Sequence, residues 1–182
     1  ITDTNNATAT DTVTITITGT NDSPTITTAI SDINYTEAVN ASSQTLSDSG
    51  TLSFSDIDDT DVIDVASSVK NGAVWNGGTI DATLKSNLEA GFSISGEDEE
   101  APGSVAWQYT ITDNFDFLAK DETITITYTV TITDPNGATA TDNVTITITG
   151  TNDSPTITTA ISDINYTEDT NASSQSLSSS GT

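Results

Sequence analysis

The sequence predicts an all-β protein, an antiparallel β-sandwich with Greek-key connections. Thr alternates with Val, Ile or Tyr over several runs, and this period of two places the apolar side chains on one face of each strand. Turn signals rich in Gly, Pro, Asn and Asp separate the runs, as they do in sandwiches. The 182 residues are enough for one such domain together with parts of others.

The expected elements follow one another along the chain with short turns between them. Alternating or apolar runs predict strands at residues 12–18, 25–30, 33–36, 51–55, 62–69, 91–95, 105–112, 123–133 and 144–149. One short helix is expected at residues 81–88, because Leu84 and Leu88 share a helical face and Gly91 follows as a stop signal. The segment NFDFLAK, residues 114–120, is expected to form a single helical turn.

A long hairpin is expected at residues 123–149. Its turn, DPNGAT, contains Pro135, which presets φ, and Gly137, which supplies a positive φ. The aromatic side chains are expected to fill the core rather than to stack on a ligand. They are Phe54, Trp75, Phe92, Trp107, Tyr109, Phe115, Phe117 and Tyr128.

The chain is strongly acidic, with 27 acidic residues against 3 basic ones and a formal net charge of −24. This charge argues against nucleic acid and anionic membranes as partners, because their phosphate groups would repel it. The charges also repel one another within a compact fold unless they are solvated or neutralised by cations, for which divalent ions are the natural candidates. No run of about 18 apolar residues occurs, so no membrane insertion is expected.

The absence of Cys and His narrows the possible chemistry. Disulfides and thiolate metal sites are excluded, and the commonest zinc ligand and general base is missing. An enzyme would have to use an Asp/Glu pair in a pocket, whereas the acids here lie in loops of a repeated unit. We therefore expect no enzyme. The Thr-rich, Lys-poor composition is typical of bacterial surface proteins.

An internal repeat organises the chain. Residues 1–37 and 132–168 differ only at Thr4/Pro135, Asn6/Gly137 and Thr12/Asn143, which sets an offset of 131 residues. A period of this length is a whole domain. We therefore expect the C-terminal hairpin of a preceding repeat at residues 1–20, a complete sandwich repeat at 21–151, and the N-terminal part of the next repeat at 152–182. The hexamer GTNDSP marks both boundaries.

Acidic residues gather where the two ends of a sandwich are expected. Strand ends cluster at two poles in a Greek-key fold, so acids that are distant in sequence converge there. We expect one pole to combine Asn21, Asp22, Asp56, Asp58 and Asp134. The opposite pole is expected to combine Glu37, Glu122, Asn152 and Asp153. Carboxylate and amide oxygens are the ligands that Ca²⁺ prefers, so both poles are candidate Ca²⁺ sites.

The segment LAKDETITITYTVTITDPNGATATDNVTITITGTNDSP resembles the VCBS-type repeat of large bacterial RTX adhesins. The resemblance covers most of residues 21–151 and both flanks, and it is least specific at residues 62–103. It implies an extracellular repeat on the bacterial cell surface, secreted by a type I system and stiffened by Ca²⁺. Its partners would be the adjacent repeats of the same chain, while other domains bind cell-surface or matrix ligands for adhesion or biofilm formation.

The repeat is also similar to cadherin domains, which implies roles for individual residues. Glu37 matches the early Glu of the cadherin pattern, and Glu122 matches the Glu of its D-R-E motif. The remaining matches pair Asn21, Asp22, Asn152 and Asp153 with the linker, Asp56 and Asp58 with the D-x-D motif, and Asp134 with the later Asp. Two departures imply fewer or weaker ions at each junction: Gly19 stands where an Asp is expected, and Lys120 lies beside the site.

Other interpretations remain open at this stage. The module is alternatively a carbohydrate- or protein-binding unit of such an adhesin. Asn21 and Asp22 alternatively form a plain turn, and the acidic run EDEE at residues 97–100 is expected to be a solvated loop. Rows of Thr would suit an ice-binding surface, although exposed strands favour Thr in any case. An isopeptide bond between a lysine and an asparagine would require burial beside an acid.

Overall fold

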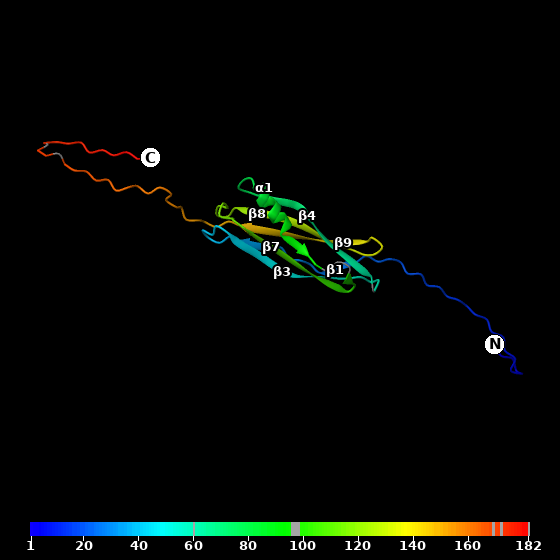
Figure 1. The fold of residues 1–182 in the computed structure, drawn as a ribbon. Coiled ribbons are helices and arrows are strands. Elements are labelled where there is room, and N and C mark those ends of the chain that lie inside the picture. Colours follow the sequence, from blue (N-terminus) through cyan, green and yellow to red (C-terminus); the bar gives the residue numbers. More distant parts are fainter. Residues whose placement is uncertain (60, 96–98, 169, 172, 182) are drawn as a thin grey trace.

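Two β-sheets pack face to face in this chain (Figure 1). The computed structural model describes residues 1–182 except 60, 96–98, 169, 172 and 182. The sheets have the strand orders β1-β3-β7-β5 and β2-β9-β8-β4-β6. The elements are β1 (Thr25–Thr28), β2 (Ile33–Thr36), β3 (Gln44–Ser55), β4 (Val62–Trp75), α1 (Ala82–Ala90), β5 (Phe92–Ile94), β6 (Glu99–Glu100), β7 (Gly103–Asp113), β8 (Thr123–Thr133) and β9 (Thr139–Thr149).

The topology is that of an immunoglobulin-like sandwich, which confirms the predicted fold class. Strands β1, β3, β7 and β5 take the places of A, B, E and D in one sheet, and β4, β8 and β9 take those of C, F and G in the other. The described strand pairs are antiparallel except β2 with β9, which is parallel from Ile33 opposite Ile146 to Thr36 opposite Thr149. This exception arises because the chain crosses between the sheets after β1.

The predicted hairpin is β8 and β9, joined in register from Thr123 opposite Thr149 to Thr133 opposite Thr139. The apolar members of β8 are buried and its threonines face outward, as the period of two requires. Strand β3 is longer than predicted, because β7 pairs with its polar N-terminal half from Gln44 onward. Strand β4 likewise continues to Trp75, with register shifts after Val69 and Asn71. Pairing with a neighbour decided these lengths.

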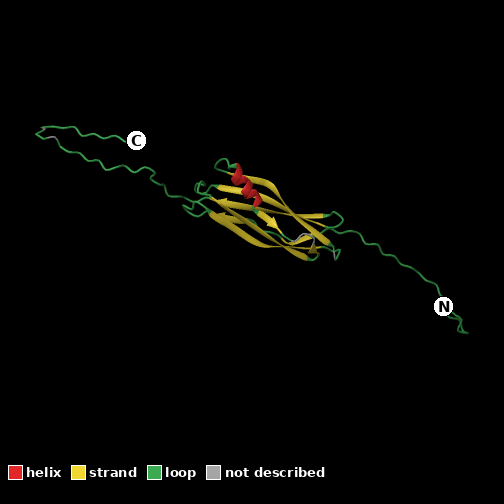
Figure 2. Ribbon diagram, in the orientation of Figure 1, coloured by secondary structure: helices red, strands yellow, loops and turns green. Residues whose placement is uncertain are grey.

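The helix lies close to its predicted position. Asp81 caps it, since Asp81 Oδ1 accepts hydrogen bonds from the backbone N–H groups of Thr83 and Leu84 at 2.8 and 3.3 Å. Leu84 and Leu88 are buried, and α1 contacts β4 and β7 (Figure 2). The segment 114–120 makes one turn, closed by the Leu118 N–H donating to the Phe115 carbonyl at 2.9 Å, and does not continue as a helix.

The strand predicted at residues 12–18 is wrong. Val13, Ile15 and Ile17 are 83%, 80% and 91% exposed, and the described residues of 1–24 contain an isolated bridge between Thr2 and Thr8 but no strand. The run VTITIT of residues 13–18 recurs at residues 144–149, where it forms part of β9 and pairs with β8 and β2 on either side. The two flanks leave opposite ends of the sandwich (Figure 1). Without those partners, the flank has nothing to complete its backbone hydrogen bonds.

Six of the eight predicted core aromatics are buried and Trp75 is half-buried, but Phe117 is 40% exposed. Phe117 instead contacts Trp75 edge to face, with ring centroids 4.9 Å apart. The acidic run 97–100 was expected to be a loop. Glu99 and Glu100 form β6 against Val62 and Ile63, with both glutamates exposed, while Glu97 and Asp98 lie outside the described residues.

Candidate metal centres at the two ends of the sandwich

One cluster of carboxylates lies at the end where the N-terminal flank joins the sandwich. We call it the upstream group: Asp56 and Asp61 from the loop after β3, and Asp134 directly after β8. One carboxylate oxygen from each residue lies within 4.8 Å of those of the other two. Asp134 is buried, and the other two are half-buried.

Hydrogen bonds hold Asp134 in place as a charged group. Its Oδ2 accepts from the Asn21 side-chain amide at 2.8 Å, and its Oδ1 accepts from the backbone N–H groups of Asn136 and Ala138 at 2.9 and 2.8 Å. These bonds, with that from Asn21 as the largest contribution, hold the pKa of Asp134 below its usual value. The Asn136 side-chain amide in turn donates to Asn21 Oδ1.

Asp56 and Asp61 are in the opposite situation. Asp56 Oδ2 and Asp61 Oδ2 are buried and have no hydrogen-bond partner. Burial raises the pKa of Asp61, and the negative charges of Asp58, Asp56 and Asp134 raise it further. Asp58 lies beside this group, where its Oδ2 accepts a hydrogen bond from the backbone N–H of Asp22 at 2.7 Å. The linker residues Asn21 and Asp22 therefore contact both acidic loops.

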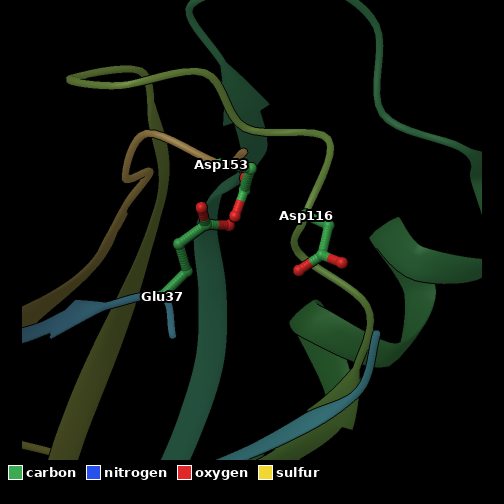
Figure 3. A group of neighbouring side chains, drawn as sticks. All are labelled: Glu37, Asp116 and Asp153. Atoms are coloured by element: carbon green, nitrogen blue, oxygen red, sulfur yellow. The ribbon is translucent and has the colours of Figure 1, made fainter. Parts of the chain in front are cut away.

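A second cluster, the downstream group, lies at the other end: Glu37, Asp116 and Asp153. Figure 3 shows the carboxylates of Glu37 and Asp153 pointing toward one another, with Asp116 on a neighbouring loop. Glu37 Oε1 accepts from the backbone N–H and the hydroxyl of Thr151 at 2.9 and 3.1 Å. Glu37 Oε2 and Asp116 Oδ1 are buried without a partner.

Glu37 is the buried member of this group, and its pKa is shifted. Its side chain is only 3% exposed, and this burial is the main cause of its raised pKa. The hydrogen bonds from Thr151 lower the pKa, and the negative charges of Asp153 and Asp116 raise it again. A cation between these carboxylates would remove both the repulsion and the unpaired oxygens.

The C-terminal linker is tied to this end by its own hydrogen bonds. Asp153 Oδ1 accepts from the backbone N–H of Asn40 at 2.6 Å, and the Ser154 N–H donates to Asn40 Oδ1 at 2.9 Å. Asn152 is exposed, and its side chain donates to the Asp153 carbonyl at 3.3 Å. Asn152 therefore lies next to the downstream group without belonging to it.

Glu122 lies at the same end but has a different environment. Its Oε2 accepts hydrogen bonds from the Trp75 indole N–H at 3.0 Å and from the backbone N–H of Ala119 at 3.1 Å. Its own backbone pairs with Ala119 and Gly150. Glu122 therefore holds the Trp75 side chain and the start of β8 in place through these hydrogen bonds. Its role as an ion ligand stays a prediction.

Most of the expected ligands lie at the predicted ends, and the structure groups two further acids with them, Asp61 and Asp116. Asp61 belongs to the acidic run SDIDDTD, and its position three residues past the expected pair was the available signal. Asp116 lies between the buried residues Phe115 and Leu118, so an acid set among core residues was the signal there. Neither signal specifies which distant carboxylates the residue will meet.

The structure contains a lysine–asparagine contact of the kind that an isopeptide bond would need, but this contact is not buried beside an acid. Lys70 Nζ donates to Asn143 Oδ1 at 3.2 Å, and the Thr129 hydroxyl donates to the same oxygen at 2.8 Å. Both Lys70 and Asn143 are exposed, and no carboxylate of the described residues contacts either side chain. The attack of a lysine on an amide requires a neutral amine and a proton donor, which an exposed site does not supply.

No protein-family model matches the sequence, and no curated protein matches it. Solved structures similar to the chain include the ASH/PapD-like domain 7 of human CEP192, with a TM-score of 0.41 and 12% identity, covering 80% of this chain and 97% of that one. Another is the sialic acid binding region of the Streptococcus sanguinis SK1 adhesin bound to 3'sLn, with a TM-score of 0.34 and 15% identity, covering 71% of this chain and 29% of that one. At this level of similarity, neither carries an argument about function. Within the described residues, no helix is long and apolar enough to cross a membrane.

Proposed function

We propose that this chain is a structural repeat of a bacterial surface adhesin, in which Ca²⁺ bound at the junctions between repeats makes the array stiff. The observation that carries the proposal is the pair of carboxylate groups at opposite ends of one sandwich, each in contact with an inter-repeat linker. The resemblance to VCBS-type repeats of RTX adhesins supports the extracellular location and secretion by a type I system.

The donor sets suit Ca²⁺. Every candidate ligand is an oxygen, which is the atom that Ca²⁺ prefers, at about 2.3–2.6 Å. Two oxygens on opposite sides of such an ion lie about 4.6–5.2 Å apart. The carboxylate oxygens of each group lie within 4.8 Å of one another, so all three can reach a common ion. Each group also contains buried carboxylate oxygens that have no hydrogen-bond partner and are therefore available to bind an ion. They belong to Asp56, Asp61, Glu37 and Asp116.

The internal repeat allows the two ends to be combined into one junction. Asp22 and Asp153 are the same position in consecutive copies of GTNDSP. The upstream copy shows this residue donating its backbone N–H to Asp58 of the repeat that follows. The downstream copy shows its carboxylate beside Glu37 and Asp116 of the repeat that precedes it. In an array, a single aspartate therefore touches the acidic clusters of both neighbours.

This arrangement explains how ions would control stiffness. Without cations, the acidic clusters of adjacent repeats repel one another across a short linker, and the linker bends. Bound Ca²⁺ supplies positive charge shared by oxygens of the linker and the sandwich, which fixes their relative position. Extracellular Ca²⁺ is about millimolar, and affinities of about 10⁻⁴–10⁻³ M are typical of extracellular modules. A stiff array would hold a distal binding domain away from the cell.

The test uses a chain with two complete repeats, residues 1–151 followed by residues 21–182. Calcium should increase its maximum dimension in small-angle scattering and raise its melting temperature, because the ion binds only the folded form. At a calcium concentration 100 times the Kd, the free energy of unfolding should rise by about 2.7 kcal/mol. Asp116→Asn in the first repeat should reduce both responses, whereas the matched variant Asp64→Asn, at an exposed strand position, should not. Identical scattering and melting with calcium and with chelator would refute the proposal.

A further inference from the structure

Each end of the sandwich exposes a large apolar side chain next to its carboxylates. Ile57 is 79% exposed and lies between Asp56 and Asp58 at the upstream end. Phe117 is 40% exposed and follows Asp116 at the downstream end. Phe117 packs edge to face on Trp75 and leaves the rest of its ring exposed, and Ile57 lies outside the hydrophobic core. Each of these side chains therefore has apolar surface available for a contact with a neighbouring repeat.

The downstream end also contains an open cleft with both apolar and polar lining residues. Its volume is about 300 Å³, and residues 116–120 and 151–153 line it, so it opens between the Phe117 loop and the linker. Lys120 lines this cleft, whereas Lys85 pairs with Glu89 and Lys70 with Asn143. Lys120 is exposed and makes no ion pair with the described part of the chain. At the upstream end, the exposed Asp59 follows Ile57 in the same loop.

We propose that the loop of residues 56–59 in each repeat docks into this cleft of the preceding repeat, with Ile57 against Phe117 and Asp59 beside Lys120. The proposal rests on the proposed function to the extent that both place repeats end to end. It adds a direct protein contact with apolar and charge complementarity, which specifies the rotation of one repeat relative to the next. The partner is the adjacent copy of the same repeat.

The shared linker aspartate brings the two surfaces within reach. Its backbone N–H lies 2.7 Å from Asp58 Oδ2 of the following repeat. Its carboxylate lies within 4.8 Å of the Asp116 carboxylate of the preceding repeat. Ile57 is the neighbour of Asp58 in sequence, and Phe117 is the neighbour of Asp116. A single residue therefore separates the loop that carries Ile57 from the loop that carries Phe117.

Cysteine crosslinking in the two-repeat chain tests this contact, because the natural sequence contains no cysteine. The junction pair combines Phe117→Cys in the first repeat with Ile57→Cys in the second. The control pair exchanges the positions, with Ile57→Cys in the first repeat and Phe117→Cys in the second, which places the thiols at the outer ends of the molecule. Both pairs are tethered in one chain, but only the junction pair can bring its thiols together, so with an added thiol oxidant it should form its intramolecular disulfide at least about tenfold faster.

Calcium separates this proposal from the proposed function. Rapid crosslinking of the junction pair alone supports docking, whether or not calcium changes the melting temperature. Equal rates for the two pairs in calcium overturn docking, even if scattering shows that calcium stiffens the chain. A second arm uses Lys120→Glu in the first repeat, which should reduce the crosslinking rate of the junction pair. Asp59→Lys in the second repeat should then restore the rate, and failure of both effects would overturn the charge contact.

Discussion

Two buried carboxylates at opposite ends of this sandwich have pKa values shifted in opposite directions. Asp134 receives hydrogen bonds from Asn21, Asn136 and Ala138, which lower its pKa and keep it charged. Glu37 is equally buried but has one oxygen without a partner, and its pKa is raised. The difference arises because Asp134 heads a tight turn whose backbone N–H groups point back at it. Glu37 has only Thr151 to satisfy it.

The pH dependence of stability follows from these shifts. A raised pKa in the folded state means that the folded chain holds protons which the unfolded chain has released, so the free energy of unfolding falls as the pH rises through that interval. Burial raises the pKa of Glu37 above 4.5 and that of Asp61 above 3.8. In calcium-free buffer, the melting temperature should therefore rise as the pH is lowered toward 4.5, where the folded chain takes up these protons before the unfolded chain does. The lowered pKa of Asp134 has the opposite effect, because its stabilising contribution is present above 3.8 and is lost as the pH falls below that value.

Scanning calorimetry of calcium-free protein across this pH range measures the effect. Glu37→Gln replaces the carboxyl with a neutral group that resembles its protonated form, so this variant should show a smaller pH dependence. A melting temperature that falls steadily as the pH is lowered toward 4.5 would contradict the assignment.

Glu122 provides a contrasting prediction. Glu122→Ala should lower the free energy of unfolding by about 1–3 kcal/mol, because the Trp75 indole N–H and the Ala119 N–H lose their acceptor. Glu122→Gln keeps an oxygen there and should lose less. Urea denaturation of both variants measures the difference. If Glu122 acts only through Trp75, both variants keep the calcium-induced rise in melting temperature. Loss of that rise in Glu122→Gln would show that the Glu122 carboxylate binds the calcium ion.

At the scale of elements, strand formation in this chain depends on pairing as much as on sequence. The run VTITIT occurs at residues 13–18 and at 144–149, but only the second copy forms a strand. That copy lies between β8 and β2, and its apolar residues are buried. The first copy lacks those neighbours and exposes its Val and Ile side chains. Alternation specifies which face is apolar, and the partner strands supply the hydrogen bonds.

The two copies offer a matched pair of substitutions. Ile146 is fully buried, so Ile146→Ala should lower the free energy of unfolding by about 2–5 kcal/mol through lost burial and a cavity. Ile15 occupies the same position in the first copy but is 80% exposed. Ile15→Ala should change the free energy of unfolding by less than about 0.5 kcal/mol. Equal losses in denaturant titrations would show that the N-terminal flank packs as β9 does.

At the scale of the whole molecule, net charge opposes folding. The chain carries −24 with three lysines, and both ends of the sandwich concentrate carboxylates. Self-repulsion of this kind destabilises a compact state and weakens as salt screens it. Most acids of the described residues are at least partly exposed, and the two buried ones, Glu37 and Asp134, lie in the carboxylate groups at the ends of the sandwich, where a cation would be shared.

Salt and calcium should therefore stabilise the chain in distinguishable ways. Raising the ionic strength with NaCl from about 0.01 to about 0.15 M shortens the Debye length from about 30 to about 8 Å, and the melting temperature should rise. Millimolar CaCl₂ at the same total ionic strength should raise it further. Thermal melting monitored by circular dichroism at matched ionic strength measures both effects. If calcium adds nothing beyond NaCl, the carboxylate groups do not bind it specifically.

Much of the candidate site follows from the linear pattern, and the remainder does not. Strand ends meet at two poles in any sandwich, which is why Asp56 and Asp134 were expected together, and the structure places their carboxylates within one group. The pattern did not single out Asp116 or Asp61, since a loop acid meets distant acids only through loop conformation. It also placed Glu122 at the correct end without showing that Trp75 occupies its oxygen.

The sequence by itself determined the sandwich, its repeat period and the acidic character of its ends, because alternation, turn residues and internal identity are local properties of the chain. Only the tertiary structure decided which strands exist and which carboxylates meet. A strand requires partners on its edges, so one VTITIT became β9 and the other an exposed flank. A binding site requires atoms within a few ångströms of each other, and the packing of separate loops sets such distances.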